Sequence, residues 1–252
     1  MVELLTDYDE KDINESSYLI NNSFHDFEDK NKRHKFIRKV YSIVSLQLLL
    51  TSLTTAFFIY YEPARKFIYT EAGQAVTWTS LIFLFVILLS LLCNPTLAKK
   101  KPVNYILLSL FTLFMSYLVA ISASTYDTES VIYAFGITFF ITVILTVYAW
   151  QTKYDFTTSG GILLSFLIGI IVASILNVFI HNKIFQIIIA ALGAVIFSCY
   201  IVYDTQLIIG GKNHKMSFGE DDYILAAITL YLDIINLFLY LLELIGFKSS
   251  NA

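Results

Sequence analysis

The sequence has few charged residues. Aspartate, glutamate, lysine and arginine make up 15% of its 252 residues, whereas about 25% is usual in soluble domains. The mean hydropathy is +0.67. This composition excludes an ordinary soluble domain and predicts a multi-pass membrane protein in contact with the lipid bilayer. The net charge of −3 is weak, and basic stretches interleaved with aromatic residues are lacking, so we expect no nucleic-acid partner.

Cysteine and histidine are scarce as well. Cys93 and Cys199 are the two cysteines and lie inside apolar runs, so we expect small buried side chains and no disulfide. The four histidines lie in the polar N-terminal stretch or between apolar runs, with no spacing typical of zinc. We therefore expect no cofactor. Residues 1–35 lack the apolar core of a signal peptide, so the first span should direct membrane insertion.

The sequence does contain seven long apolar segments. Each approaches the ~20 residues that a helix needs to cross a bilayer, and these lengths fit helices better than barrel strands. We therefore predict an all-α membrane protein, a seven-transmembrane-helix bundle over residues 36–247, with a flexible N-terminal tail (1–35) and a short C-terminal tail (248–252). The predicted spans are residues 39–60, 75–93, 103–124, 130–150, 160–180, 184–209 and 223–246.

The distribution of lysine and arginine predicts the orientation. The N-terminal flank and alternate connections carry twelve of these residues, whereas the opposite connections carry four. Because cytosolic loops are enriched in positive charge, the N-terminus should face the cytosol. Seven spans then place the C-terminus on the other side. The last segment contains polar residues, so a re-entrant hairpin that returns the C-terminus to the cytosol is an open alternative.

Two neighbouring spans each contain a carboxylate. Asp204 lies in "LGAVIFSCYIVYDTQLIIGG" and Asp233 lies in "AAITLYLDIINLFLYLLELIGF". A charged aspartate at mid-membrane costs roughly 2.5–3.5 kcal/mol on insertion scales and usually marks a pathway or a proton site. The two spans should be antiparallel neighbours, and a modest tilt would bring the carboxyls together. Such a pair would titrate as a unit and would bind Ca²⁺ weakly. Single aspartates bonded to neighbouring helices are the structural alternative.

Other polar residues have simpler explanations beside a functional one. Asp127 and Glu129 lie in the turn "YDTES", where carboxylates favour the start of a helix. The alternative is an acidic vestibule for cations. Glu243 and Asn236 lie in the last span and are further candidates for lining a cation path.

Several stretches together resemble the transmembrane Bax inhibitor motif family, in particular its lifeguard branch. They occur in the order and at the spacing of the family and cover about residues 35–247. The stretches are "FIRKVYSIVSLQLLLT" (36–51), "DTESVIYAFGIT" (127–138), "QTKYDFT" (151–157), "YDTQLIIGG" (203–211) and "DDYILAAITLYLDIINLFLYLLELIG" (221–246).

The resemblance implies a seven-helix bundle whose last helix is central. It also implies a pH-sensitive Ca²⁺ leak channel of the endoplasmic reticulum, Golgi or endolysosomal membrane that suppresses cell death. Asp204 and Asp233 match a pair of aspartates that form a pH-sensing latch in bacterial relatives. The second predicted span has no charged residue, so Arg38 and Lys39 at the cytosolic mouth are candidate basic partners of the pair.

Three other classes of function are alternatives to a channel. Intramembrane aspartyl proteases also use paired aspartates, but the chain lacks their GxGD and PAL motifs, and no histidine within a span could serve a serine protease. We therefore predict that the chain is not an enzyme. A seven-span receptor would have the opposite orientation. A non-conducting scaffold that regulates calcium channels or apoptosis regulators is the main alternative.

Overall fold

The structure is a bundle of helices. The computed structural model describes residues 2–210 and 216–249, and over these residues helices are joined by short connections. The apolar runs form helices because a backbone in hydrocarbon must satisfy its own hydrogen bonds. The elements are α1 (Val2–Tyr60), α2 (Glu62–Ile68), α3 (Glu71–Cys93), η1 (Pro95–Ala98), α4 (Val103–Ser124), α5 (Thr128–Gln151), η2 (Phe156–Ser159), α6 (Gly160–Ile180), α7 (Lys183–Ile209) and α8 (Tyr223–Ser249).

Seven of the described helices are long and apolar enough to cross a membrane. They are α1 from Lys30 onward and α3 to α8, and α2 is a short connecting helix between the first two spans. The prediction of an all-α protein with seven spans is therefore confirmed. Apart from the first span, which begins earlier than expected at Lys30, the predicted boundaries lie within about four residues of those in the structure.

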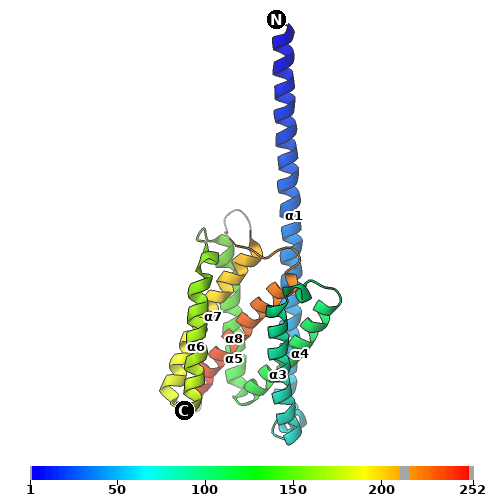
Figure 1. The fold of residues 1–252 in the computed structure, drawn as a ribbon. Coiled ribbons are helices and arrows are strands. Elements are labelled where there is room, and N and C mark those ends of the chain that lie inside the picture. Colours follow the sequence, from blue (N-terminus) through cyan, green and yellow to red (C-terminus); the bar gives the residue numbers. More distant parts are fainter. Residues whose placement is uncertain (1, 211–215, 250–252) are drawn as a thin grey trace.

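The last helix, α8, occupies the centre of the bundle. It crosses the bundle obliquely (Figure 1) and packs against α7, α5, α1 and α4. Within its most apolar window 61% of the residues are buried, compared with 6–33% in the other six spans. The structure therefore confirms the central last helix. Because α8 is one uninterrupted helix from Tyr223 to Ser249, the alternative of a re-entrant hairpin is wrong.

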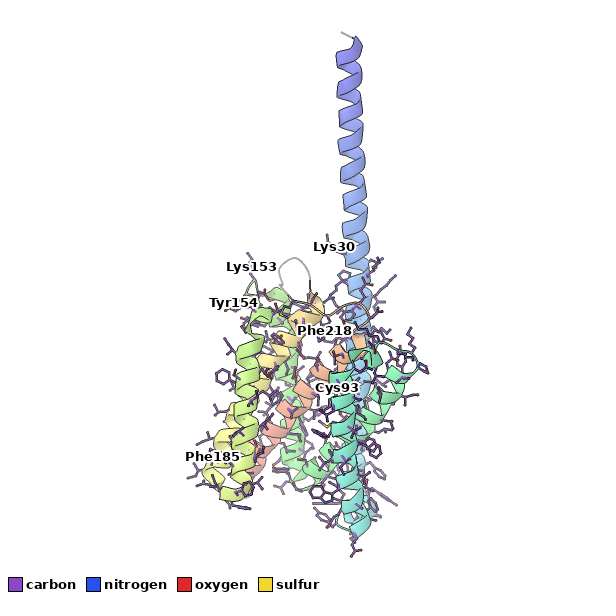
Figure 2. All side chains as sticks on the ribbon, viewed as in Figure 1. Lys30, Cys93, Lys153, Tyr154, Phe185 and Phe218 are labelled. Carbon is purple, nitrogen blue, oxygen red and sulfur yellow. The ribbon has the colours of Figure 1, made fainter. Side chains whose placement is uncertain are left out.

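The labelled residues distinguish the two ends of the bundle. Lys30, Lys153, Tyr154 and Phe218 lie at the end from which α1 projects, whereas Phe185 lies at the opposite end (Figure 2). We call the end that carries Lys30, Lys153 and Phe218 the basic end. That this end faces the cytosol stays a prediction based on its excess of lysine and arginine.

Two local expectations differ from the structure. The N-terminal stretch, expected to be a flexible tail, continues α1 as a helix that projects away from the bundle (Figure 1); its flexibility stays a prediction. Cys93 and Cys199, expected to be buried, are exposed free cysteines. The physical reason is that the outside of a membrane protein faces hydrocarbon, so an apolar run does not predict burial within the protein.

A polar network fixes α1 against α4 and α8 in the interior. The Gln47 amide donates to Thr112 Oγ1 at 3.0 Å. The Thr51 hydroxyl lies 2.9 Å from Ser116 Oγ and 2.8 Å from the Tyr231 hydroxyl. Tyr231 is fully buried. Hydrogen bonds of this kind hold membrane helices together where the hydrophobic effect between them is weak.

Candidate functional site

Asp204 and Asp233 meet at the interface between α7 and α8. Asp204 is 5% exposed and Asp233 is 6% exposed, and their carboxyl groups lie within hydrogen-bonding contact of each other. Asp204 is five residues from the end of α7 and Asp233 is ten residues from the start of α8. The oblique path of α8 (Figure 1) offsets this difference in depth. The sequence predicted this pairing from the short loop and a modest tilt.

The surroundings of the pair are mostly uncharged. Thr229, one turn before Asp233 on α8, is also within hydrogen-bonding contact of Asp204. The phenol of Tyr200 lies within electrostatic range of both carboxyls, and that of Tyr203 lies within range of Asp204. Asp233 Oδ2 is buried and has no hydrogen-bond partner among the described residues. A hydrogen bond between two carboxyls requires a proton on one of them, so the geometry fits a pair that shares one proton.

The ligand set of the pair is small for a metal ion. Among the residues that the structure describes, no three histidine, cysteine, aspartate or glutamate side chains gather in one place. Ca²⁺ usually takes six to eight oxygen ligands, and the pair offers two carboxyl groups. The Thr229 hydroxyl, which also donates to the carbonyl of Ala226 at 3.2 Å, is a further oxygen in contact with Asp204. This arrangement fits weak or transient contact with a cation better than a tight resident site.

The two basic residues proposed as partners of the pair lie elsewhere. Arg38 is exposed. The Lys39 ammonium lies 3.1 Å from the centroid of the Tyr223 ring, a cation–π contact at the start of α8. Tyr223 is ten residues before Asp233, about 15 Å along the helix, so Lys39 anchors the end of α8. The Tyr223 hydroxyl also accepts a 3.1 Å hydrogen bond from Asn104 of α4.

Arg33 is a basic residue that sequence reasoning missed. Its guanidinium donates to the carbonyl of Ile209 at 2.8 Å, of Leu207 at 2.7 Å and of Phe218 at 2.7 Å. The first two carbonyls lie in the last turn of α7, which lacks intrahelical partners. Arg33 therefore connects α1 to the end of the helix that carries Asp204. The signal in the sequence was a cluster of basic residues before the first span, and only the fold shows which of them is used.

Gln206 joins two of the motifs that carried the family resemblance. It is fully buried, two residues after Asp204. Its amide donates to the carbonyl of Tyr154 at 2.9 Å, and its carbonyl accepts from the backbone of Phe156 at 2.8 Å. The loop before α6 is thereby held against α7 at the basic end, where Tyr154 is seen in Figure 2. In the same loop Asp155 caps η2 by accepting from the backbone of Thr157 at 3.0 Å.

The other candidates in the last span make local contacts. Asn236 donates to the carbonyl of Leu232 on its own helix at 2.8 Å. Glu243 is half-buried and accepts a 2.6 Å hydrogen bond from Gln186 of α7, away from the aspartate pair. Gly193 of α7 lies between the aspartate pair and the Gln186–Glu243 hydrogen bond, and it packs against the Tyr240 ring. An added Cβ at Gly193 would be 2.6 Å from Tyr240 Cε2.

Asp127 and Glu129 lie at the start of α5. Asp127 occupies the N-cap position, although its side chain makes no capping hydrogen bond, and Glu129 lies in the first turn. Both side chains are exposed. The structure brings neither of them to the aspartate pair, and their role as a cation vestibule stays a prediction.

Seven spans with a carboxyl pair buried between the last two define an integral, multi-pass membrane protein of the all-α class. Comparison with known families narrows this class. Residues 33–250 match the model of the family described as inhibitor of apoptosis-promoting Bax1. The chain belongs to the Bax inhibitor-1 family.

Named relatives come from the lifeguard branch that the motifs predicted. The chain is 38% identical to human protein lifeguard 3 over 225 residues, which cover 88% of this chain and 71% of the relative. Mouse protein lifeguard 3 is 35% identical over 93% of this chain and 77% of its own length. Mouse protein lifeguard 4 is 37% identical over 93% of this chain and 91% of its own length.

Proposed function

We propose that the protein is a pH-sensitive calcium leak channel of an intracellular membrane that lowers store calcium and suppresses cell death. The observation that supports this proposal best is the buried contact between Asp204 of α7 and Asp233 of the central helix α8. Membership of a family described as inhibitors of apoptosis-promoting Bax1 supports the role in cell death.

The proposed gate is the seam between α7 and α8. When the pair shares a proton, the two carboxyls hold the helices together at this level. When both are ionised, two like charges in a poorly hydrated site repel each other or bind a cation that neutralises them. The number of protons on the pair therefore changes the force between the helices. Because the pair is coupled, its protons are bound and released as a unit.

The proposed orientation puts the pair within reach of the cytosol. If the basic end is cytosolic, Asp204 lies five residues, about 8 Å, inside the end of α7. Two features then lie at the same cytosolic end of α7. They are the loop that Gln206 binds and the contacts of Arg33 with the last turn of the helix. We propose the endoplasmic reticulum, Golgi or endolysosomal membrane as the location.

Calcium flux in liposomes that contain only the purified protein tests this proposal. Wild type, the double variant Asp204→Asn/Asp233→Asn and the control Glu71→Gln would be measured at pH 6, 7 and 8. Glu71 is an exposed carboxylate in the first turn of α3, so this variant removes a carboxylate outside the site. We expect pH-dependent flux in wild type and the control, and flux without pH dependence in the double variant.

A non-conducting scaffold is the second candidate, and one feature favours it. The helical stretch of α1 that projects beyond the bundle (Figure 1) offers a surface for calcium channels or apoptosis regulators. Absence of flux at every pH from folded wild-type protein would favour the scaffold and leave the aspartates with a structural role.

A further inference from the structure

Four exposed cations gather at the basic end, beside the start of α4. They are Lys35 and Arg38 of α1 and Lys100 and Lys101 of the connection before α4. Within the described part of the chain, none of the four side chains has an ion pair or a hydrogen bond. Exposed positive charge by itself is usual at a cytosolic end. A binding site requires in addition that the fold hold these charges close together.

The register between α1 and α4 brings the two pairs of cations to the same level. The two interior hydrogen bonds between these helices each join residues that are 65 positions apart, so the helices run parallel at a constant offset. The Asn104 N–H donates to the Lys100 carbonyl at 3.0 Å, which extends helical bonding back to Lys100. Continued to that residue, the offset places Lys35 level with Lys100. Arg38 lies three residues further along the same face of α1.

A chain of contacts holds the two elements together at this level. The Lys39 ammonium lies over the Tyr223 ring, and Asn104 donates both to the Tyr223 hydroxyl at 3.1 Å and to the Ala98 carbonyl at 3.2 Å. The contacts thus run from α1 through the start of α8 to the connection before α4. Both segments that carry the exposed cations are therefore fixed against the same part of the central helix.

The acidic residues nearby are engaged by other cations. Asp222 forms an ion pair with Lys99 at 2.9 Å, and Asp221 lies within electrostatic range of the same lysine. Glu220 lies within electrostatic range of Arg33. Among the described residues no carboxylate forms an ion pair with any of the four exposed cations. Four positive charges held together without a counter-ion indicate an anion from outside the chain.

The level of the four cations in the membrane indicates the kind of anion. Lys100 and Lys101 lie just before the span Val103–Ser124, where the headgroup layer borders the hydrocarbon core. Basic clusters next to a span typically bind anionic headgroups. We propose that the four exposed cations bind the phosphate groups of one anionic glycerophospholipid in the leaflet at the basic end. Four cations fit a headgroup with a phosphomonoester best, because that group carries more than one negative charge.

Native mass spectrometry of the purified full chain tests this proposal. The protein in detergent would be titrated with phosphatidylinositol 4-phosphate, phosphatidylserine or phosphatidylcholine, all with the same acyl chains. The fraction of protein that retains one lipid gives a Kd for each. We expect the lowest Kd for phosphatidylinositol 4-phosphate and a Kd at least about tenfold higher for phosphatidylcholine. Equal Kd values for the three lipids would overturn the proposal.

A pair of substitutions with a matched control locates the site. Each basic residue near an anionic surface contributes about fivefold in affinity, so Lys100→Gln/Lys101→Gln should raise the Kd for phosphatidylinositol 4-phosphate about 25-fold. The control Lys153→Gln/Lys183→Gln also removes two exposed lysines and should change this Kd by less than about twofold. Lys153 lies across the basic end from α1 (Figure 2), and Lys183 begins α7 at the opposite end. Equal losses in the two variants would show an effect of net charge and would overturn the site.

A soluble headgroup distinguishes a lipid from a free phosphate compound. Inositol 1,4-bisphosphate carries a phosphomonoester but has no acyl chains. At equal concentration we expect it to leave phosphatidylinositol 4-phosphate bound, because it lacks the apolar contacts of the lipid. Displacement of the lipid would instead identify a site for soluble phosphates and would overturn the lipid as the occupant. None of these measurements involves calcium flux, so their outcome is independent of the proposed channel.

Discussion

The Arg33 guanidinium occupies the space that a side chain at position 210 would need. Gly210 ends α7 with a positive φ of 57°, and an added Cβ there would clash with the guanidinium. The same guanidinium binds the carbonyls of Leu207 and Ile209 just before this glycine. The glycine is therefore required both by its backbone conformation and by the approach of a residue 177 positions earlier in the chain.

Loss of the Arg33 contacts should destabilise the bundle. Arg33→Gln removes three charge-assisted hydrogen bonds from a half-buried position, and we expect a loss of about 2–3 kcal/mol of unfolding free energy. Thermal unfolding in detergent measures the change. Arg38→Gln, an exposed arginine on the same helix, is the control and should change stability by less than about 0.5 kcal/mol. Equal effects of both variants would contradict the assignment.

Gly210→Ala should be destabilising for two separable reasons. A positive φ combined with ψ of −158° is a conformation essentially confined to glycine and costs another residue about 1–3 kcal/mol, and the methyl group displaces Arg33. In an Arg33→Gln background only the conformational part should remain, so a double-mutant cycle should show coupling of about 1 kcal/mol. Gly169→Ala is the control, because an added Cβ there meets nothing within 4 Å. Additive effects of the two substitutions would argue against the clash.

Gln206→Leu should release the loop between α5 and α6. The substitution leaves the Phe156 N–H and the Tyr154 carbonyl without their partner, at a cost of about 2 kcal/mol. Amide hydrogen exchange at Phe156 should become faster, whereas exchange in the middle of α7 should stay slow. The exposed Gln151 at the end of α5 provides the control Gln151→Leu. Unchanged exchange at Phe156 in Gln206→Leu would show that the loop is held by other contacts.

The ion pair of Lys99 with Asp222 should be intact between pH 6 and 8 and should be lost only at high pH. The Lys99 ammonium lies 2.9 Å from Asp222, and this hydrogen bond, with the attraction of the carboxylate, raises the pKa of Lys99 above its ordinary value. A raised lysine pKa gives stabilisation that is complete below about pH 10 and is lost as the pH rises through the folded-state pKa. Lys99→Gln should therefore leave the pH response of calcium flux between pH 6 and 8 unchanged. A loss of that response would place Lys99 in the gate.

The sequence was sufficient for the spans and for the aspartate pair. Apolar runs of about 20 residues locate spans directly, because hydrocarbon thickness fixes their length. Asp204 and Asp233 were recognisable because a carboxylate in such a run is rare and costly. A short loop then left the two helices few ways to pack. Burial was less predictable, as Cys93 and Cys199 illustrate, because apolar residues suit the lipid-facing surface and the core alike.

The residues that connect the helices at the basic end were not predictable from composition. Lys39 and Arg33 lie in the same basic cluster, yet one contacts an aromatic ring and the other contacts backbone carbonyls. Which contact each residue makes depends on the rotation of α1 about its own axis relative to α7 and α8. The hydrogen bond between Thr51 and Tyr231 in the interior is one of the contacts that fix this rotation. Such long-range pairs follow from packing, which no local pattern in the sequence records.

The contacts between α7 and α8 are not distributed evenly along their interface. The Gln186–Glu243 hydrogen bond and the close packing of Gly193 under Tyr240 both lie on the same side of the aspartate pair. If the carboxyls separate while these contacts hold, α7 cannot slide along α8. It can only rotate away from α8 about the end that carries Gln186 and Gly193. The displacement then grows with distance from that end. It would be largest at Gly210, so the Arg33 contacts at that end of α7 would oppose the separation of the two helices.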